Sequence, residues 1–303
     1  MLTQQKLLFL FMAIVIFVFT GIAGAESQYD MMMKCVPDYM RNINFQPSNI
    51  NVLDSFIFNE NIEVDSITYI SDNLKITGLV YKPVNGKISA GIVIAHGYYP
   101  VATYFQGQGT FETGIKLAKN GFVVIIPDYR GYNKSEGGNN YPYPGESVDV
   151  IIAAMNLKKQ YNLQKIYLIG YSWGGGIAAT AAEISRVFDK LILYYPQMGG
   201  VEINQREFVA LKQQLGLTGK QIMDFFYAKS PIYGCGYINI PVMIFHGLLD
   251  KTVKAEQPEK LYALLKEKKK NVQMKMYEDY SHAFADDPNN KSWNELIKFL
   301  KGK

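Results

Sequence analysis

Cysteine and histidine are scarce in this sequence, and strong charge of either sign is absent. Of the 303 residues, two are cysteine and three are histidine. The spacing of the two cysteines offers no metal site. The formal net charge of +4 is spread along the chain, so nothing indicates a nucleic-acid partner. With no repeat or low-complexity tract, 48% hydrophobic and 19% charged residues fit one α/β domain with a large core.

One long hydrophobic run lies at the N-terminus. Lys6 precedes the apolar residues 7–19, and Ala23-Gly24-Ala25 resembles a signal-peptidase cleavage site. We expect residues 1–25 to be a secretory signal peptide, which makes the mature protein secreted or periplasmic without stable membrane insertion. The alternative is an uncleaved membrane anchor, although the apolar stretch is slightly short for a span. No cysteine lies at the cleavage point, so lipoprotein processing is not indicated.

A nucleophile elbow is the most informative motif in the chain. The strand-like residues 165–169 are followed by Gly170-Tyr171-Ser172-Trp173-Gly174 and then by a helical pattern over 177–185. A G-x-S-x-G motif indicates a nucleophilic serine when it lies on a sharp turn between a strand and a helix. The glycines avoid clashes in the strained turn, and the helix N-terminus lies beside the hydroxyl. We expect Ser172 to be a catalytic nucleophile; the alternative is an ordinary strand-to-helix turn.

His282 is the predicted general base. A serine hydroxyl needs a base to remove its proton, and in the order serine, acid, histidine that base follows the serine in sequence. His96 precedes Ser172, and His246 ends a strand that reads as buried. His282 lies in a loop after the strand-like residues 272–277, so it fits the role. The alternative is an uninvolved surface-loop histidine.

Asp250 is the predicted acid that orients this histidine. Residues 241–246 read as a buried strand, and a glycine turn then leads to Asp250 at the carboxyl end of that strand. The preceding strand ends in Tyr195-Pro196-Gln197, which contains no acid. Glu278 and Asp279 are rivals, but they lie so close to His282 in sequence that we expect them to flank it.

Acyl transfer also needs hydrogen-bond donors for the oxyanion. The backbone N–H of Trp173, directly after the nucleophile, is the first candidate. The second is the N–H of Tyr98, in the loop that follows the strand-like residues 91–95, with Tyr99 as the next choice. We expect His96 to brace this loop rather than to act in catalysis.

Several motifs together resemble the α/β-hydrolases, most closely the prolyl-oligopeptidase-like and dienelactone-hydrolase-like catalytic domains. The resemblance spans about residues 65–300 and rests on His96-Gly97, the loop 128–137, Gly170-Tyr171-Ser172-Trp173-Gly174-Gly175, Ser230-Pro231-Ile232-Tyr233, the turn 246–250 and Ser281-His282. It implies a fold but no particular substrate, because the superfamily hosts many chemistries. Prolyl oligopeptidases carry a large β-propeller before this domain. Here we expect only about forty residues before the domain once the signal peptide is removed, too few for a propeller.

The predicted architecture is an α/β-hydrolase fold with a mostly parallel sheet and helices on both faces. Apolar runs rich in Ile and Val alternate with helical patterns, which is typical of such sheets. The expected strands cover 67–71, 74–81, 91–95, 122–127, 165–169, 191–195, 241–246 and 272–277, and the expected helices cover 110–119, 147–160, 177–185, a stretch from about 255, and 293–300. We assign 26–64 to an N-terminal extension and 65–303 to the catalytic domain. Residues 72–73 form the turn between the first two strands, which we expect to be antiparallel.

Residues 198–237 break this alternation and suggest a small helical lid insertion over the nucleophile. Phe225, Phe226, Tyr227 and Tyr233 would then offer an aromatic wall to an apolar acyl or aromatic group of the substrate. We also expect Tyr99 to contact the substrate. The alternative is that these aromatic side chains only fix the insertion onto the core.

The sequence does not decide whether the two cysteines pair or which group Arg130 binds. In an oxidising compartment Cys35 and Cys235 either form a disulfide or remain free thiols, because sequence provides no geometry. Arg130 binds a substrate carboxylate or forms a structural salt bridge with Asp128 or Glu136, and we favour the salt bridge.

The sequence predicts an exported serine hydrolase that cleaves an ester or amide of a small molecule and uses no cofactor or metal. Ser172, His282 and Asp250 would form an acyl-enzyme that water then hydrolyses. An esterase is preferred, because no second domain to bind an extended chain is visible. The first alternative is an aminopeptidase-like enzyme for short peptides. The second is a catalytically silent binding protein, which would lack one of these three residues.

Overall fold

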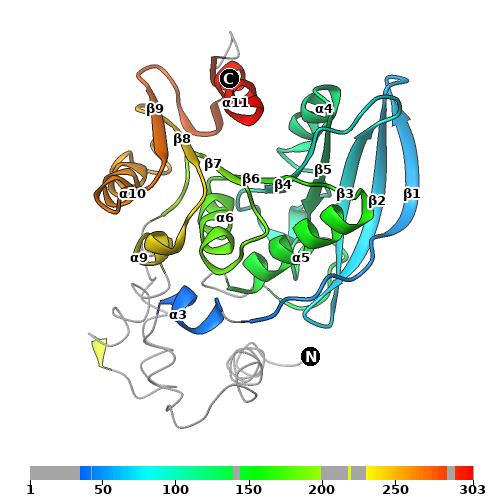
Figure 1. Ribbon diagram of the computed structural model, residues 1–303, viewed down its shortest axis with the longest axis horizontal. Coiled ribbons are helices and arrows are strands. Elements are labelled where there is room, and N and C mark those ends of the chain that lie inside the picture. The colour runs from blue at the N-terminus through cyan, green and yellow to red at the C-terminus, as the bar shows by residue number, and fades with distance from the viewer. Residues whose placement is uncertain are drawn as a thin grey trace.

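A nine-stranded sheet runs through the protein (Figure 1). The computed structural model describes residues 35–41, 43–138, 144–198, 218–219, 230–284 and 291–302. The strands are β1 (Asn51–Phe58), β2 (Ile62–Ser71), β3 (Leu74–Pro83), β4 (Ala90–Ala95), β5 (Phe122–Pro127), β6 (Ile166–Tyr171), β7 (Lys190–Tyr194), β8 (Val242–Gly247) and β9 (Val272–Tyr277). Their order across the sheet is β1-β2-β3-β5-β4-β6-β7-β8-β9.

The sheet begins antiparallel and continues parallel. β1, β2, β3 and β5 pair antiparallel in that order, and every later pair is parallel. Asp72 and Asn73 join β2 to β3 with φ of 51° and 62°. Aspartate and asparagine tolerate such left-handed conformations, which a tight two-residue hairpin requires. The turn therefore lies where the sequence predicts it, and the parallel strands place their carboxyl ends along one edge.

Helices cover both faces of the sheet, as the sequence predicts. One core cluster joins the sheet to α5 (Pro144–Gln160), α6 (Trp173–Ile184) and α10 (Glu256–Glu267), and the other joins it to α4 (Phe111–Lys119) and α11 (Lys291–Lys301). Figure 1 shows these two layers on opposite sides of the sheet. The shorter helical segments are α3 (Val36–Met40), η1 (Val101–Thr103), α9 (Pro231–Gly234), η2 (Cys235–Tyr237) and η3 (His282–Phe284). Strands β4, β5 and β8 are buried along their whole length, because both faces are covered.

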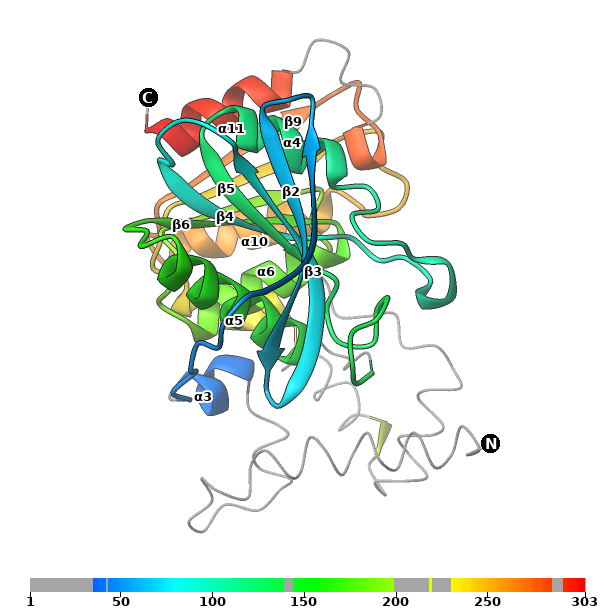
Figure 2. The ribbon, with the colours of Figure 1, turned by 90° about the vertical axis from the view of Figure 1, so that its right-hand side faces the viewer.

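The sheet starts earlier in the chain than the sequence suggests. β1 pairs with β2 along almost its entire length, and β2 itself begins at Ile62. The expected domain start at residue 65 therefore falls inside β2, and part of the expected N-terminal extension belongs to the sheet. Figure 2 looks onto this end of the sheet, where β1 forms the outer strand. Nearly all of β1 is exposed, including Val52, Leu53 and Phe56.

Two predicted segments lie wholly or largely outside the described residues. The expected signal peptide, residues 1–25, is one of them. The other is most of the expected insertion 198–237, whose described ends meet, because the Ser230 hydroxyl donates to the Met198 carbonyl oxygen over 2.7 Å. Within the part of the chain that is described, no helix combines the length and the apolar character needed to cross a membrane.

Candidate active site

Ser172 occupies a strained turn between β6 and α6. Its backbone has φ 52° and ψ −121°, a conformation that non-glycine residues adopt only where the surroundings enforce it. A Cβ at Gly170 would lie 2.6 Å from the Gly174 carbonyl oxygen, and one at Gly174 would lie 2.2 Å from the His96 carbonyl oxygen. Both contacts are too short for any side chain. The two glycines of the motif therefore permit the close approach of strand, helix and the loop after β4.

Backbone hydrogen bonds fix this turn in place. The Ser172 N–H donates to the Tyr194 carbonyl oxygen at the end of β7 over 3.0 Å. The Ser172 carbonyl oxygen accepts from the N–H groups of Gly175 at 2.8 Å and Gln197 at 2.9 Å. The serine backbone is thus held from the neighbouring strand and from its own helix, which leaves the hydroxyl at the N-terminal end of α6. Positive potential at a helix N-terminus favours negative charge there.

Asp250, His282 and Ser172 form a continuous hydrogen-bonded line. His282 Nδ1 lies 2.7 Å from Asp250 Oδ2, and His282 Nε2 lies 3.1 Å from Ser172 Oγ. The Asp250 side chain is fully buried, and that of His282 is 24% exposed. These three residues follow β6, β8 and β9, so they meet at the carboxyl edge of the sheet, where ligands bind in open α/β folds.

The carboxylate of Asp250 has fixed partners on both oxygens. Its Oδ1 accepts from the N–H groups of Thr252 and Val253, each over 2.8 Å, while Oδ2 faces His282. The turn that carries Asp250 packs against Tyr280, because a Cβ at Gly247 would lie 2.1 Å from the Tyr280 carbonyl oxygen. This close approach brings the loop that holds His282 next to the loop that holds Asp250.

Tyr195 packs against the histidine, a contact that no sequence motif indicates. Its ring lies edge-on to the His282 ring at a centroid distance of 4.7 Å. Tyr195 follows β7 directly and has a φ of 39°. Its one signal in the sequence is its place at the carboxyl end of a strand. Glu278 and Asp279 are both exposed, and the carboxylate that contacts His282 Nδ1 is that of Asp250.

His246 is a second histidine beside the acid. It is completely buried in β8, and its Nε2 lies 3.9 Å from Asp250 Oδ2, which is too far for a hydrogen bond. Burial lowers the pKa of His246, and the nearby Asp250 charge opposes that shift. The position agrees with the expectation that His246 ends a buried strand.

The loop after β4 lies next to the serine. A Cβ added to Gly97 would be 3.5 Å from the Ser172 Cβ, and the ring of Tyr98 packs edge-on against Trp173 at 6.1 Å. Within the described residues the Tyr98 N–H donates to no acceptor. Trp173 is the first residue of α6 and directly follows the serine. Both predicted oxyanion donors thus flank the nucleophile.

His96 packs inside an aromatic cluster beneath this loop. Its ring stacks on Tyr129 at 4.1 Å and on Tyr104 at 4.9 Å. Its Nδ1 lies 2.7 Å from the Gly97 carbonyl oxygen, so this nitrogen carries the proton and donates. Burial lowers the pKa of His96, which favours the neutral ring. His96 lies away from the hydrogen-bonded line and contacts the loop that carries Tyr98.

The Asp128 loop forms polar networks apart from this line. Asp128 is buried and accepts hydrogen bonds from four side chains, those of Thr77, Tyr104, Gln106 and Asn133.

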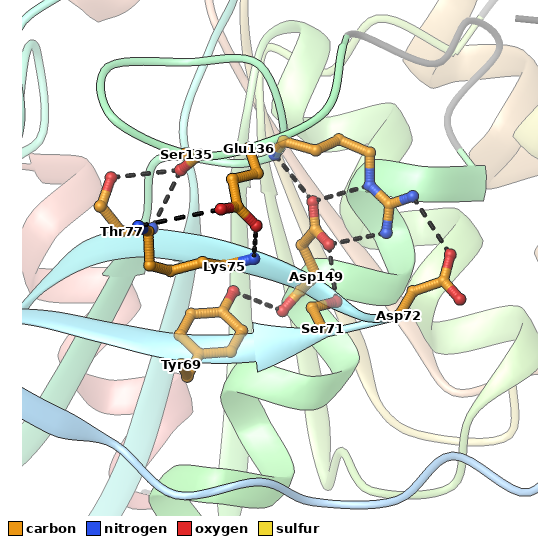
Figure 3. A network of polar contacts seen from close by, with 9 residues as sticks. Tyr69, Ser71, Asp72, Lys75, Thr77, Ser135, Glu136 and Asp149 are labelled. Carbon is orange, nitrogen blue, oxygen red and sulfur yellow. Dashed lines mark hydrogen bonds and ion pairs between the residues drawn. The ribbon is translucent and has the colours of Figure 1, made fainter. Parts of the chain in front are cut away.

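Arg130 forms a structural salt bridge, as predicted, but its partners are neither Asp128 nor Glu136. Its guanidinium donates to Asp149 on α5 through Nε at 3.1 Å and Nη2 at 2.8 Å, and its Nη1 lies 3.5 Å from Asp72 Oδ2. Glu136 instead lies near Lys75 (Figure 3). Arg130 is almost fully buried and committed to these acids, so it has no role as a substrate clamp.

The predicted substrate-binding residues do not all gather at this edge. Tyr99 lies in the loop after β4, and its hydroxyl points toward Gly109. Phe225, Phe226 and Tyr227 lie outside the described residues. Tyr233 lies in α9, whose Gly234 packs against Glu183 near the far end of α6 from Ser172. The structure therefore does not place Tyr233 beside the hydrogen-bonded line.

Both cysteines are free thiols that lie near Glu183. The Cys35 thiol donates to Asp38 over 2.7 Å. Burial raises the pKa of Cys35 to about 12 and that of Cys235 to about 11, so neither thiol forms a thiolate readily. This environment differs from the electropositive surroundings of reactive cysteines.

Known proteins resemble this chain in family, in sequence and in fold. A family model described as "Dienelactone hydrolase family" matches residues 76–301. The chain is 26% identical over 259 residues to the uncharacterized peptidase YtmA of Bacillus subtilis, covering 80% of this chain and 95% of that protein. It is also 27% identical over 191 residues to human protein ABHD12B, covering 57% of this chain and 51% of that one.

Solved structures share the fold. Acetyl xylan esterase from Paenibacillus sp. R4 superposes with a TM-score of 0.68 at 17% identity, covering 91% of this chain and 95% of that one. Acetyl xylan esterase 1 from Thermoanaerobacterium gives 0.66 at 15% identity, with 91% and 93% covered. An acylaminoacyl peptidase of Pyrococcus horikoshii gives 0.62 at 17% identity, covering 80% of this chain and 42% of that one. The predicted α/β-hydrolase fold is confirmed.

Proposed function

Because the chain belongs to the dienelactone hydrolase family, we propose that it is an exported serine hydrolase that cleaves an ester of a small molecule. At the level of the family, the chain is a hydrolase of the esterase or peptidase type. One observation carries the finer proposal: a buried carboxylate, an imidazole and a strained serine lie in line, with contacts of 2.7 Å and 3.1 Å. This arrangement is the one that activates a serine hydroxyl.

In the first half of the reaction Ser172 attacks the substrate carbonyl carbon. As the Oγ–carbon bond forms, His282 Nε2 accepts the hydroxyl proton, and Asp250 stabilises the resulting imidazolium through Nδ1–H. The tetrahedral intermediate then collapses. The bond to the leaving alcohol breaks, and His282 returns the proton to the alcohol oxygen, which leaves an acyl-serine.

Water completes the second half of the reaction. His282 removes a proton from water while the water oxygen attacks the acyl carbon, and the proton then passes to Ser172 Oγ as the ester bond to the enzyme breaks. The products are a carboxylic acid and the free enzyme. No group outside the chain is needed for either half, so the proposed mechanism uses no cofactor.

The oxyanion of each intermediate would accept hydrogen bonds from the backbone N–H groups of Trp173 and Tyr98. Support comes from their position, since Trp173 opens α6 directly after the nucleophile and the Tyr98 loop packs against the serine. Donors of this kind that are fixed before the reaction typically contribute about 10²–10³-fold in kcat each. The Trp173 N–H belongs to the buried first turn of α6, which satisfies the condition for such preorganisation on that side of the site.

An apolar substrate fits the rim of the site. Leu248 and Leu249, directly before Asp250, are 48% and 55% exposed, and Tyr98 is 62% exposed. Large apolar side chains that remain exposed beside a site favour an apolar ligand surface. A carboxylic ester with an apolar acyl or alcohol group is therefore the proposed substrate class.

Two other functions are weighed against the esterase. A peptidase for short peptides is favoured by the identity to YtmA, which carries the word peptidase in its name. The esterase is favoured by the acetyl xylan esterases, which match over more than 90% of both chains, whereas the acylaminoacyl peptidase matches over 42% of its length. A silent binding protein on this fold would not need three functional side chains held in line.

A substrate panel with a matched variant tests the proposal. Purified mature protein is assayed with p-nitrophenyl esters of increasing acyl length and with aminoacyl p-nitroanilides, beside Ser172→Ala. The proposal predicts ester hydrolysis that exceeds anilide hydrolysis and that the variant loses. Faster anilide hydrolysis would establish the peptidase, and no turnover of any substrate by the wild type would support the binding protein.

A further inference from the structure

His246 is a buried imidazole that the proposed mechanism does not use. It lies in β8, four residues before Asp250, and its side chain is completely buried. Neither of its ring nitrogens forms a hydrogen bond of good geometry with a described residue. A buried polar group without a partner destabilises a fold, so this ring needs a physical reason for its place beside the acid.

Asp250 has one acceptor site to spare. A carboxylate offers about four such sites, two on each oxygen. The N–H groups of Thr252 and Val253 occupy Oδ1, and His282 Nδ1 lies 2.7 Å from Oδ2. Among the described residues no other group hydrogen-bonds to Oδ2, so its second site is open. His246 Nε2 lies 3.9 Å from this oxygen.

The charge on Asp250 selects one tautomer of the His246 ring. Burial lowers the pKa of His246, so the ring is neutral and carries one proton, which the Asp250 charge and, less strongly, the Val253 backbone favour. A proton on Nε2 places an N–H group before the negative Oδ2, whereas a proton on Nδ1 places a lone pair there. The first arrangement is attractive and the second repulsive. Nε2–H therefore faces the same carboxylate oxygen that contacts His282.

Three ionisable groups act on His246 from the elements around it. Asp250 follows β8 itself, Glu256 begins α10, and His282 follows β9. The Asp250 and Glu256 charges favour a proton on His246, and a charge on His282 disfavours it. On the β7 side, the ring of Tyr195 packs on His282. Electrostatic coupling is mutual, so a change at His246 is felt at His282.

We propose that His246 is a positioning residue: its Nε2–H group stabilises the Asp250 carboxylate, holds Oδ2 toward His282 and lowers the proton affinity of His282. A donor to the carboxylate matters most while His282 is neutral, because an imidazolium would itself compensate the negative charge. The donor thus favours neutral His282 and extends activity to lower pH. This inference rests on the proposed function, in which neutral His282 accepts the proton of Ser172.

NMR titration of the His282 ring tests the proposal without a substrate. His246→Phe keeps a ring but removes the N–H group, so the pKa of His282 is expected to rise by about 0.5 unit. His246→Gln carries an amide donor near the position of Nε2 and is expected to restore the pKa to within about 0.2 unit of the wild type. Ile244→Val, buried on the same face of β8, is the matched packing control and should leave the pKa unchanged. In the ester assay, the acid limb of kcat/KM should move in the same direction as the pKa.

Two results would overturn the proposal. One is the same His282 pKa in His246→Phe and the wild type, and the other is an equal rise in Ile244→Val, because each assigns His246 to packing alone. If His246→Phe does not fold, the ¹⁵N spectrum of the wild-type ring decides: a proton on Nε2 supports the proposal, and a proton on Nδ1 excludes it. The expected pKa shift without any ester turnover would contradict the proposed function and not the role of His246 toward Asp250.

Discussion

At the scale of single residues, Asp250 is held more firmly than its two partners. Both of its oxygens have fixed donors, two backbone N–H groups on one side and His282 on the other. Its side chain is completely buried, so water does not compete for these bonds. In the proposed mechanism, this environment would hold the imidazole in the tautomer that presents a free Nε2 to Ser172.

Asp250→Asn is predicted to cripple hydrolysis and leave the fold intact. The side chains are nearly isosteric, but an amide that donates to Nδ1 stabilises the wrong imidazole tautomer, so kcat should fall on the order of 10⁴-fold. The control is Asp279→Asn, an exposed charge whose removal should cost less than tenfold, or under about 1 kcal/mol. Steady-state kinetics and melting curves measure both. The reverse ranking would assign the orienting role to Asp279.

Residue types and chain order were enough to nominate Ser172, Asp250 and His282 from the sequence. Each follows an apolar run, and parallel strands bring their ends to one edge. The partners of Arg130 were not predictable in the same way. Asp149 lies on α5 and Asp72 in a hairpin, so their distance from Arg130 depends on packing between elements that sequence does not reveal.

At the scale of elements, the elbow depends on glycine for packing as well as for its turn. A Cβ at Gly174 would lie 2.2 Å and 2.3 Å from two carbonyl oxygens of β4 and its following loop, and backbone cannot yield as a side chain does. The α6 helix could approach β4 only by distorting the turn that holds Ser172. If Ser172 is the nucleophile as proposed, stability and catalysis depend on the same atoms.

Gly174→Ala is predicted to destabilise the protein by more than about 2 kcal/mol, at the upper end of overpacking costs. The matched control is Gly97→Ala, where an added Cβ would meet nothing closer than 3.5 Å, an ordinary contact. Its free energy of unfolding should change by less than about 1 kcal/mol. Urea unfolding of both variants measures the difference. Equal destabilisation would mean that the elbow tolerates a larger separation of helix and strand.

Glu183 on α6 provides a pH-dependent test of how this helix packs. It is buried, its Oε1 accepts no hydrogen bond from the described residues, and burial raises its pKa well above the ordinary value of 4.5. The carboxyl therefore stays protonated in the folded state while the unfolded chain ionises. Its contribution to stability is complete below pH 4.5 and is lost as the pH rises toward the folded-state pKa.

Glu183→Gln should remove this dependence. The variant and the wild type are expected to melt at similar temperatures near pH 4.5, and the variant should melt about 2–4 °C higher at pH 8. Thermal unfolding across this range, expressed as the difference between the two proteins, isolates Glu183 from other titrating groups. A difference that is constant with pH would show that Glu183 is ionised in the folded protein.

Among the strands, most could be predicted from the sequence, but β1 could not. Strands β4 to β9 were predictable, because their apolar runs are bounded by turns and separated by helical patterns. β1 was not, because a bulge between Val52 and Asp54 interrupts the alternation and the apolar side chains at 52, 53, 56 and 57 follow no period of two. Pairing with β2, rather than burial, makes these residues a strand.

At the scale of the whole molecule, the proposed active site lies at the carboxyl edge of one continuous sheet. Ser172, Asp250 and His282 follow β6, β8 and β9, and the parallel pairing from β6 to β9 places the ends of these strands along that edge.

Export of the whole chain is a prediction with a direct measurement. The apolar residues 7–19 and Ala23-Gly24-Ala25 predict cleavage after Ala25, so N-terminal sequencing of protein recovered from a secretion-competent host should begin at Glu26. An intact N-terminus in the membrane fraction would instead identify an uncleaved anchor.

The central claim is that Ser172 is the nucleophile, and covalent labelling with a fluorophosphonate tests it most directly. The reagent phosphonylates an activated serine, and mass spectrometry of the digested protein locates the adduct. We predict one adduct per chain on the peptide that contains Ser172, no adduct on Ser172→Ala, and strongly slowed labelling of His282→Ala, because the imidazole that activates the hydroxyl is missing. An adduct on another residue, or labelling of Ser172→Ala at the wild-type rate, would contradict the account.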